Sequence, residues 1–509
     1  MSQSPCKLYA TVRKLSAFEP IALFAHLSEY AEKEGQAFYQ NNQTGISIGL
    51  IESALCLRGK RNTFRLRTLN KMGGTLFPQL IAQFPYPLVN TSQIGNQFEA
   101  ELPLPPASAS LSQRLKNHPI IELIRSHLLS VEGDLPEAFS GGLIGAFSYD
   151  LIRQLETIPE NPQDELDEPN YLLFVPSLFF VIDKAANQTS FVALSLTKND
   201  PDNARELDKL IQLAKQPIPL SLPNFKAESL ISDTSQTDYE QGVLQFKEHI
   251  KAGDIFQGVY GRMEAGNCEG NPFAAFYHLT QINPSPFQFY LRTFDGALFG
   301  ASPELQVQVD SHNSKQRVTI SPIAGSRPVK ADSHSNIRQQ IRLRTDSKEL
   351  AEHVMLIDLA RNDIASIAKA GTTEVTDAFA LKQYSHIQHL VSTVRGELQD
   401  RYDALDAYFA TMNMGTLTGA PKVRATQLIA RYEKNARGFF GGGFGIISSN
   451  GNMDTCIVIR SIRVKNDRVY LRAAAGIVAD SHPIQEYEET ETKMAACKKA
   501  LLLASGASL

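Results

Sequence analysis

Residues 346–363 read DSKELAEHVMLIDLARND, and this stretch predicts an amphipathic helix on which acidic side chains gather. Asp346 can cap the first turn, with Glu349 reaching back to it. Apolar residues recur at helical spacing at Leu350, Val354 and Ile357. Glu349 and Glu352 then lie about one turn apart on a common face. Such a pair is more typical of a solvated helix face, but if it is buried it needs a cation, a proton or an arginine.

The composition is that of an ordinary globular protein. Its 509 residues, 43% hydrophobic and 20% charged, suffice for a large core and, by length, for two or three domains. The formal net charge of -4 gives no electrostatic signal for nucleic acid or an anionic membrane. Five dispersed cysteines without a CxxC pair argue against a disulfide framework. The N-terminus also lacks a signal-peptide pattern, so we expect a cytoplasmic protein.

Helical and strand-like patterns alternate along the chain, which predicts an α+β fold. Residues 20–33 look helical, whereas residues 45–53 look like a strand. Residues 215–233 are rich in Pro and Ser and form the best linker candidate. We therefore predict two domains, residues 1–234 and 235–509.

The second domain opens with a helix whose predicted capping box is Thr237 and Glu240, followed by a strand that begins at Gln257. Taken alone, Gln257 is an edge-strand side chain that faces solvent. Two short motifs suggest ligand sites but fail on their details. The HxxH pair at residues 386–389 lacks a third metal ligand, and residues 415–422 have three residues between their glycines where a P-loop has four.

The last helical pattern, residues 481–503, follows Pro483 and places Glu486, Glu489 and Lys493 on one face. A surface ion pair between Glu489 and Lys493, four residues apart, explains this pattern as well as a functional site does. The residues of this segment alone do not decide between the two interpretations.

Eight motifs occur in an order that is typical of one enzyme family. They are IAGSRP (323–328), DSKELAEHVMLIDLARND (346–363), SHIQHLVS (385–392), MNMGTLTGAPKVRA (412–425), GGGFG (441–445), DTCIVIRS (454–461), AAAGIVADS (473–481) and EYEETETK (486–493). With them the chain resembles component I of anthranilate synthase, in the chorismate-utilising enzyme family. LIES at 50–53 and GGLIGAFSYD at 141–150 resemble the amino-terminal domain of that family. The resemblance implies two large antiparallel β-sheets packed face to face, helices outside, and an active site in a cleft of the second domain.

The resemblance also implies a metal and a substrate site. Glu352 and Glu489 would bind one Mg²⁺, with Glu349 and Glu486 as outer partners, and the ring carboxylate of chorismate would complete the shell. Arg460 would bind the side-chain carboxylate of the substrate. The other implied substrate-binding positions are Gly325, Ser326, Phe440, Ala474, Ala475, Gly476 and Lys493.

In the implied reaction a nucleophile adds at ring C2, the C4 hydroxyl leaves, and pyruvate is then eliminated to give an aromatic ring. Glu304 resembles the family's general acid, which requires a raised pKa. His389 resembles the histidine that assists elimination, in preference to His386. Gln257 stands where water-adding members have a lysine, and a glutamine cannot deprotonate water. Together with Ala324, which offers no nucleophile, it favours direct amination by ammonia to give anthranilate.

Ammonia as a substrate implies a partner subunit. None of the five cysteines has the glycine-flanked surroundings of a glutaminase nucleophile, so we expect a separate glutamine amidotransferase, two of each chain forming a heterotetramer. Two further segments resemble the family's tryptophan feedback pocket and give Ser53, Pro286, Phe287 and Gln288 as its residues. Gln288 replaces a usual methionine, which predicts weak or altered inhibition.

Three positions inside the implied site depart from the family pattern. Phe440 replaces a tyrosine, Ala474 a glycine and Ser326 a threonine. Phe440 removes one hydrogen bond, and Ala474 adds a methyl group where the backbone must come close. Two alternatives therefore stay open: an enzyme that stops at 2-amino-2-deoxyisochorismate, and a non-catalytic ligand-binding subunit.

Overall fold

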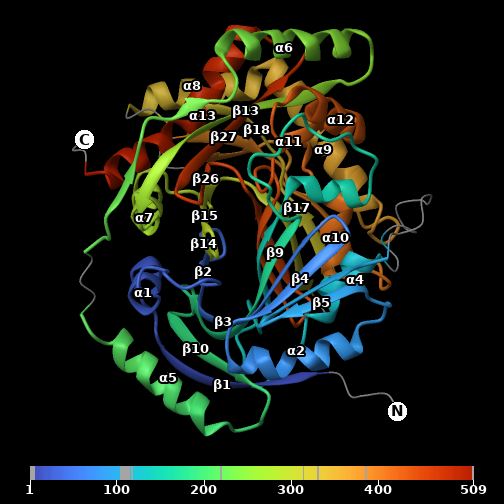
Figure 1. Cartoon of the computed structure of the whole chain (residues 1–509). Coiled ribbons are helices and arrows are strands. Elements are labelled where there is room, and N and C mark those ends of the chain that lie inside the picture. Colours follow the sequence, from blue (N-terminus) through green and yellow to red (C-terminus); the bar gives the residue numbers. More distant parts are fainter. Residues whose placement is uncertain are drawn as a thin grey trace.

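The two halves of the sequence share one sheet. The structure is a computed structural model (Figure 1), and it describes residues 6–103, 115, 118–217, 221–312, 315–329, 332–383 and 387–506. In this part of the chain 24 strands form one hydrogen-bonded network with almost wholly antiparallel pairings. Three further strands form a separate small sheet: β18 (Ile323–Pro328), β21 (Ile387–Val391) and β20 (Ala380–Gln383).

Strand pairings join the amino-terminal and carboxy-terminal parts. Strand β2 (Ala37–Asn41) pairs with β14 (Phe287–Thr293), so that Gln40 lies opposite Gln288. Strand β8 (Gly142–Phe147) pairs with β24 (Gly443–Ser448). The proposed boundary between residues 234 and 235 therefore separates two stretches of sequence that complete each other's sheet, and the domain division itself stays a prediction.

The remaining long strands set the frame of the molecule. Their bounds are β1 Lys7–Ser16, β3 Ile46–Lys60, β4 Thr63–Thr68, β9 Tyr171–Asp183, β10 Gln188–Ser195, β13 Gln257–Gly270, β15 Gly296–Ser302, β16 Leu305–His312, β17 Lys315–Ile320, β25 Met453–Ile457, β26 Ser461–Lys465 and β27 Arg468–Ile477. The long strand β9 is buried at nearly every residue, as expected for a strand covered on both faces.

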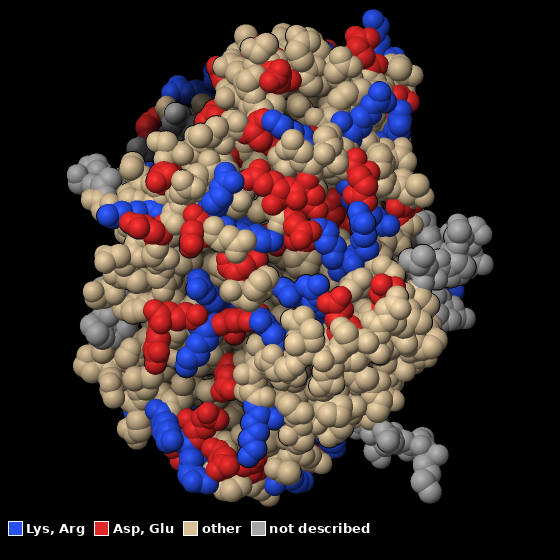
Figure 2. Space-filling view, in the orientation of Figure 1, with Lys and Arg blue, Asp and Glu red and all other residues tan. Residues whose placement is uncertain are grey.

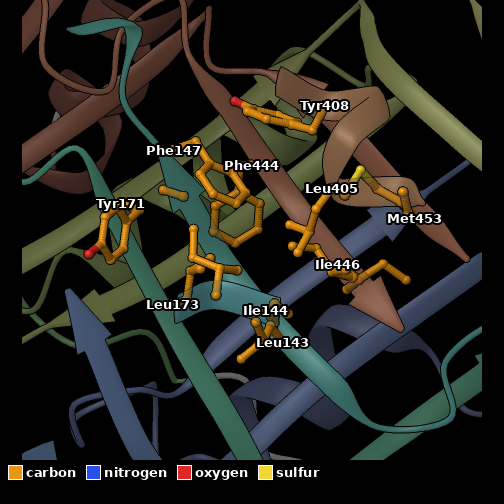
Figure 3. Close-up of a cluster of buried hydrophobic side chains, with 14 of the residues drawn as sticks. Leu143, Ile144, Phe147, Tyr171, Leu173, Leu405, Tyr408, Phe444, Ile446 and Met453 are labelled. Atoms are coloured by element: carbon orange, nitrogen blue, oxygen red, sulfur yellow. The ribbon is translucent and has the colours of Figure 1, made fainter. Parts of the chain in front are cut away.

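Aromatic and branched side chains from both halves fill the main core (Figure 3). The ring of Phe147 in β8 lies 4.4 Å from that of Tyr408. Phe444 in β24 stacks on Phe289 in β14 at a centroid distance of 4.8 Å. Since these rings come from segments up to about 300 residues apart, the core holds the two halves together as one unit.

Most helices lie around the outside of the strands (Figure 1), whereas α10 (Ala404–Thr411) is buried at every residue. They are α1 Pro20–Leu27, α2 Lys71–Gln83, α4 Pro119–Ser126, α5 Pro201–Ala214, α6 Gln236–Lys251, α7 Phe273–Ile282, α8 Ser333–Thr345, α9 Ser347–Ala365, α10 Ala404–Thr411, α11 Gly415–Thr418, α12 Lys422–Tyr432 and α13 Pro483–Ala504. A second core cluster packs α1, α5, α7 and α13 against the strands. The predicted α+β class with antiparallel sheets is confirmed, with most helices outside and α10 buried.

Three local predictions need correction. Helix α1 ends at Leu27, not near residue 33, because the chain turns through left-handed backbone at Glu29 (φ 51°). Helix α6 is capped by Ser235, whose hydroxyl accepts a hydrogen bond from the Asp238 amide at 3.1 Å, not by Thr237. Gln257 is only 6% exposed, because β13 is paired on both sides at that end.

The distribution of charged side chains on the surface agrees with the nearly balanced numbers of acidic and basic residues in the sequence. On the face in Figure 2, acidic and basic side chains are interspersed in small groups rather than gathered into one basic stripe. Among the described residues, no helix combines the length and the apolar character needed to cross a membrane.

Candidate functional site

One cleft of about 200 Å³ gathers most of the predicted site residues. Its walls come from α9, α11, α13, β18, β21 and β27, and from the connections between β15 and β16, before β24 and after β25. The predicted residues that line it are Glu304, Gly325, Glu352, His389, Phe440, Arg460, Ala474, Gly476, Glu489 and Lys493. Since these positions span almost 190 residues of sequence, only the fold brings them together.

Glu304 lies in the cleft between β15 and β16, and it is 4% exposed. Burial raises the pKa of its carboxyl to about 8, although the positive charge of Lys493 acts in the opposite direction. Its Oε1 atom has no hydrogen-bond partner among the described residues. A buried carboxyl of this kind is largely protonated at neutral pH and can donate a proton.

His389 lies in β21 opposite the bulge that Gly325 forms in β18. Gly325 has φ 65°, a left-handed conformation that favours glycine. The Nδ1 atom of His389 lies 3.0 Å from the carbonyl oxygen of Gly325, so this nitrogen carries the proton and donates it. Burial lowers the pKa of the imidazole to about 4, which keeps the ring neutral.

Two cations line the cleft on the side of α13. Arg460 lies in the connection between β25 and β26 and has a left-handed backbone conformation (φ 49°). Its side chain lines the cleft. Its Nη1 donates to the carbonyl oxygen of Lys493 at 3.2 Å. The Nζ of Lys493 donates to the carbonyl oxygen of Ala474 at 2.6 Å. Both side chains are therefore held in place before an anionic ligand arrives.

The two predicted metal ligands approach the cleft from different helices, Glu352 from α9 and Glu489 from α13. Glu489 is paired with Lys493 at 2.6 Å, so the ion pair suggested by the sequence exists as well as the placement at the cleft. Among the described residues, no three acidic, histidine or cysteine side chains group closely enough to hold a metal alone. Two carboxylates on an open cleft nevertheless suit Mg²⁺, which keeps waters and ligand oxygens in its shell.

Glu349 and Glu486, the expected outer partners of the metal, lie in different surroundings. Glu349 is ion-paired with Arg327 at 3.1 Å, and Arg327 also contacts Asp346 at 3.1 Å. The amide of Glu349 is 3.3 Å from the Asp346 carboxylate, as expected for the predicted helix cap. Glu486 on α13 is buried.

Gln257 lies directly beside the cleft without lining it. A Cβ added at Gly476, a lining residue, would meet the Gln257 Nε2 atom at 2.8 Å, so glycine is needed for this close approach. The Oε1 atom of Gln257 is buried and has no hydrogen-bond partner in the described part of the chain. Gln257 therefore presents an unsatisfied acceptor next to the cleft.

The other predicted substrate positions differ in what they present. Ala474 lines the cleft, whereas Ala475 lies on the opposite face of β27 and packs in an apolar cluster. Phe440 lines the cleft with its ring 5.8 Å from the Arg437 guanidinium. Ser326 is adjacent to Gly325 in β18, and its side chain is outside the described structure, as is the whole of His386.

The sequence analysis missed two polar residues of the cleft, Thr416 and Arg472. Thr416 belongs to a motif that was noted without a role for it. Arg472 is buried in β27 among apolar residues, and a charged residue within an otherwise apolar strand was the available signal.

The predicted tryptophan segments do not come together. Asn41 pairs with Phe287 on one side and with Ile46 on the other, and Ser53 lies seven residues further along β3. At about 3.3 Å per residue, Ser53 is roughly 20 Å from Phe287. The Ser53 hydroxyl donates instead to the Gly35 carbonyl oxygen at 2.8 Å. The grouping of Ser53 with Pro286, Phe287 and Gln288 is therefore wrong.

Asn42 lies where Ser53 was expected. Its backbone amide donates to the carbonyl oxygen of Pro286 at 2.7 Å, and its Nδ2 donates to that of Ser285 at 2.7 Å. The error arose because LIES belongs to β3, whereas the end of β2 and Asn42 lie beside residues 286–288, and a short motif does not reveal which strands pair.

Comparisons with known proteins identify the family of the chain. A family model described as chorismate binding enzyme matches residues 92–499. Anthranilate synthase component 1 of Escherichia coli K12 is 38% identical over 90% of this chain and 89% of its own length. The pyocyanine-specific anthranilate synthase component 1 of Pseudomonas aeruginosa is 37% identical over 90% of this chain and 87% of its own length.

Solved structures share the fold. Anthranilate synthase component I of Streptococcus pneumoniae superposes with a TM-score of 0.70 at 26% identity, covering 90% of this chain and 93% of that one. The menaquinone-specific isochorismate synthase of Escherichia coli gives a TM-score of 0.66 at 16% identity, covering 98% and 96%, which supports the fold alone.

Proposed function

Because the chain belongs to the family of chorismate-binding enzymes, we propose that it is the large subunit of an anthranilate synthase, which converts chorismate and ammonia into anthranilate and pyruvate. One observation carries the proposal most directly. A protonated carboxyl, a neutral histidine and two fixed cations face a single cleft, next to a glutamine with a free acceptor atom.

Substrate binding follows from charge. Chorismate carries two carboxylates, and the guanidinium of Arg460 can hold the side-chain carboxylate through two parallel hydrogen bonds. Lys493 adds a second positive charge at the same wall. Backbone groups of residues 474–476 lie along this wall, where the small side chains let a ligand approach closely.

The first chemical stage joins nitrogen to the ring and expels a hydroxyl. Ammonia forms a bond to C2, both ring double bonds shift by one position, and the C4–O bond breaks. The new ammonium group at C2 then gives one proton to solvent. Glu304 gives its proton to the departing oxygen, which leaves as water. The pKa of about 8 keeps this proton available at neutral pH.

The second stage makes the ring aromatic. The C2 proton is removed, the bond from the ring to the enolpyruvyl oxygen breaks, and the enolpyruvyl group takes up a proton and leaves as pyruvate. His389 holds its only proton on Nδ1 toward Gly325, so its Nε2 has a lone pair to accept the C2 proton.

The choice of nucleophile follows from Gln257. Its amide cannot deprotonate water, whereas ammonia is nucleophilic without a base. The unpaired Oε1 atom can accept a hydrogen bond from ammonia and orient its lone pair toward C2.

Mg²⁺ would be held by Glu352 and Glu489, and when bound it supplies positive charge opposite the ring carboxylate of chorismate. The carboxylate of Glu489 is then shared with Lys493, which keeps its second contact to the Ala474 carbonyl oxygen.

The direct test uses the purified chain with chorismate, Mg²⁺ and ammonium at alkaline pH. We expect anthranilate and pyruvate in equal amounts, and no anthranilate after chelation of the metal. An aminated product that keeps its enolpyruvyl group would identify a 2-amino-2-deoxyisochorismate synthase instead. Unreacted chorismate would contradict both enzymes and favour a ligand-binding subunit.

Phe440→Tyr should improve the use of chorismate. The added hydroxyl enters the cleft and can donate one hydrogen bond, which is worth about 3- to 10-fold in affinity. We expect KM for chorismate to fall by that factor while kcat stays within about twofold. Phe439→Tyr, at a buried neighbour that does not line the cleft, is the matched control and should not lower KM.

The partner, the compartment and the regulation belong to the proposal as well. We expect a separate glutamine amidotransferase to supply ammonia, in a heterotetramer with two copies of each chain, in the cytoplasm. Tryptophan would bind next to Pro286, Phe287 and Gln288, close to the side chain of Asn42.

Gln288→Met should strengthen inhibition by tryptophan. The buried amide of Gln288 has to be covered by an apolar indole, at a cost that a methionine does not impose. We expect the half-inhibiting concentration of tryptophan to fall by about fivefold or more. Ser53→Ala should leave it unchanged, because Ser53 lies far along β3. A strong effect of Ser53→Ala alone would contradict this placement.

A further inference from the structure

Arg472 borders the substrate cleft, and the proposed reaction does not yet give it a role. It lies in β27, where successive side chains alternate between the two faces of the strand. Arg472, Ala474 and Gly476 are two positions apart, so they share one face, and all three line the cleft. The Arg472 side chain therefore starts from the wall whose backbone groups are proposed to face the substrate.

Three buried arginines border an internal cavity of about 30 Å³ beside the cleft, and two of them are fully engaged in the fold. Arg437 donates hydrogen bonds from all three of its nitrogens, and the Glu433 carboxylate accepts most of them. Arg463 also donates from all three nitrogens, among others to Glu168 and Asp295. These carboxylates balance the two charges, so both arginines are structural.

Arg472, the third arginine of this cavity, is bonded differently. Its Nη2 donates to the carbonyl oxygen of Asn435 at 2.9 Å. Its Nη1 is 3.6 Å from the Oε2 of Glu433, too far for a hydrogen bond, and that carboxylate is already bound by Arg437. Its Nε–H is buried and has no acceptor among the described residues. Because an arginine keeps its charge in a protein, the fold leaves one N–H group and part of a positive charge unused.

The surroundings of Arg472 place it toward Arg460 and away from the metal. Phe440 borders both the cleft and the internal cavity, as Arg472 does. Val458, two residues before Arg460, also borders this cavity. The two proposed metal ligands line the cleft without bordering the cavity. Since the Phe440 ring has no hydrogen-bond donor, Arg472 provides a donor for a ligand at this part of the wall.

We propose that Arg472 is a further substrate-binding residue, whose free Nε–H donates to the enolpyruvyl carboxylate of chorismate that Arg460 also binds. The inference deepens the proposed function and rests on it, since it takes chorismate as the ligand. An arginine that is only 9% exposed and has an unused N–H costs free energy, and a bound carboxylate recovers it. Arg472 thereby favours a ligand with two carboxylates over one that has the ring carboxylate alone.

Arg472→Met tests this assignment, because methionine has a long, unbranched side chain without a charge or a strong donor. Binding of chorismate is measured by calorimetry with Mg²⁺ and without ammonium, so the readout needs no turnover. A hydrogen bond to a charged group is worth about 10- to 100-fold in affinity. We expect Kd for chorismate to rise by about that factor. Kd for anthranilate, which has only the ring carboxylate, should stay within about twofold.

Arg468→Met is the matched control on the same strand. The side chain of Arg468 is 46% exposed and does not line the cleft, so neither Kd should change. Arg472→Lys keeps the charge but has no N–H at the position of Nε. It should recover part of the lost affinity, and it provides a second variant if Arg472→Met does not fold.

Two results in a folded variant would overturn the assignment. An unchanged Kd for chorismate would mean that Arg472 does not bind the substrate. An equal loss of affinity for chorismate and anthranilate would mean that Arg472 only supports the wall of the cleft. Turnover of the parent with ammonium is measured separately. If the parent binds chorismate but makes no anthranilate, the proposed reaction fails, while the two Kd values still decide the role of Arg472.

Discussion

Glu304→Gln should lower kcat by about 10³-fold, with little change in KM for chorismate. Glutamine has nearly the same shape as a protonated glutamic acid, but it cannot transfer a proton to the departing C4 oxygen. General acid catalysis contributes about 10²- to 10⁴-fold to such steps. The measurement is steady-state turnover of chorismate with ammonium, with anthranilate followed by fluorescence. A variant that keeps more than a tenth of the parent's kcat would contradict the role of Glu304.

The pH dependence provides an independent check. Because burial raises the pKa of Glu304 to about 8, the proton-donating form dominates below that pH and disappears above it. The turnover rate of the parent, divided by the concentration of free ammonia, should therefore fall as the pH rises through about 8. The Glu304→Gln variant should not show this fall.

The Glu304→Gln variant should be more stable than the parent at high pH, although its activity is lower. The folded chain holds the Glu304 proton more tightly than the unfolded chain, whose pKa stays near 4.5. The resulting stability is fully present below about pH 4.5 and is lost as the pH rises through about 8. Glu304→Gln removes this loss, so we expect its thermal midpoint to exceed that of the parent above pH 8. A lower midpoint there would indicate that the substitution damages the fold.

Glu489→Gln should lower Mg²⁺-dependent turnover by about 10²-fold or more and leave the fold intact. Loss of an outer partner of a bound metal typically costs 10- to 100-fold, and loss of a direct ligand should cost at least as much. The side chain of Glu489 is 48% exposed, so its ion pair with Lys493 contributes little to stability. Turnover is measured as a function of Mg²⁺ concentration, and direct binding of the metal by calorimetry provides a readout besides activity.

Glu488→Gln is the matched control on the same helix. Glu488 is exposed and does not line the cleft, yet it carries the same charge one residue away. We expect its Mg²⁺ dependence to equal that of the parent. If both variants lose turnover equally, the effect comes from the general acidity of α13, and the assignment of Glu489 as a metal ligand would be wrong.

The sequence predicted residues that line the cleft wherever a motif was long and contiguous. The capped helix at 346–363 formed as expected, since its cap and its apolar spacing are local properties of the chain. The acidic residue of α9 and that of α13 face the same cleft, as the ordered motifs implied. Fold class followed in the same way, because eight motifs in fixed order constrain the whole second half.

Only the tertiary structure decided where these residues stand relative to one another. Gln257 looks exposed in sequence and is buried because residues 420 and 477 pair beside it, more than 150 positions away. Ser53 belongs to a short motif and yet lies far along β3 from Phe287, since the pairing register places Asn41 and Ile46 there instead. The raised pKa of Glu304 and the lowered pKa of His389 depend on burial. Burial is a sum over distant contacts, and a single stretch of sequence does not contain it.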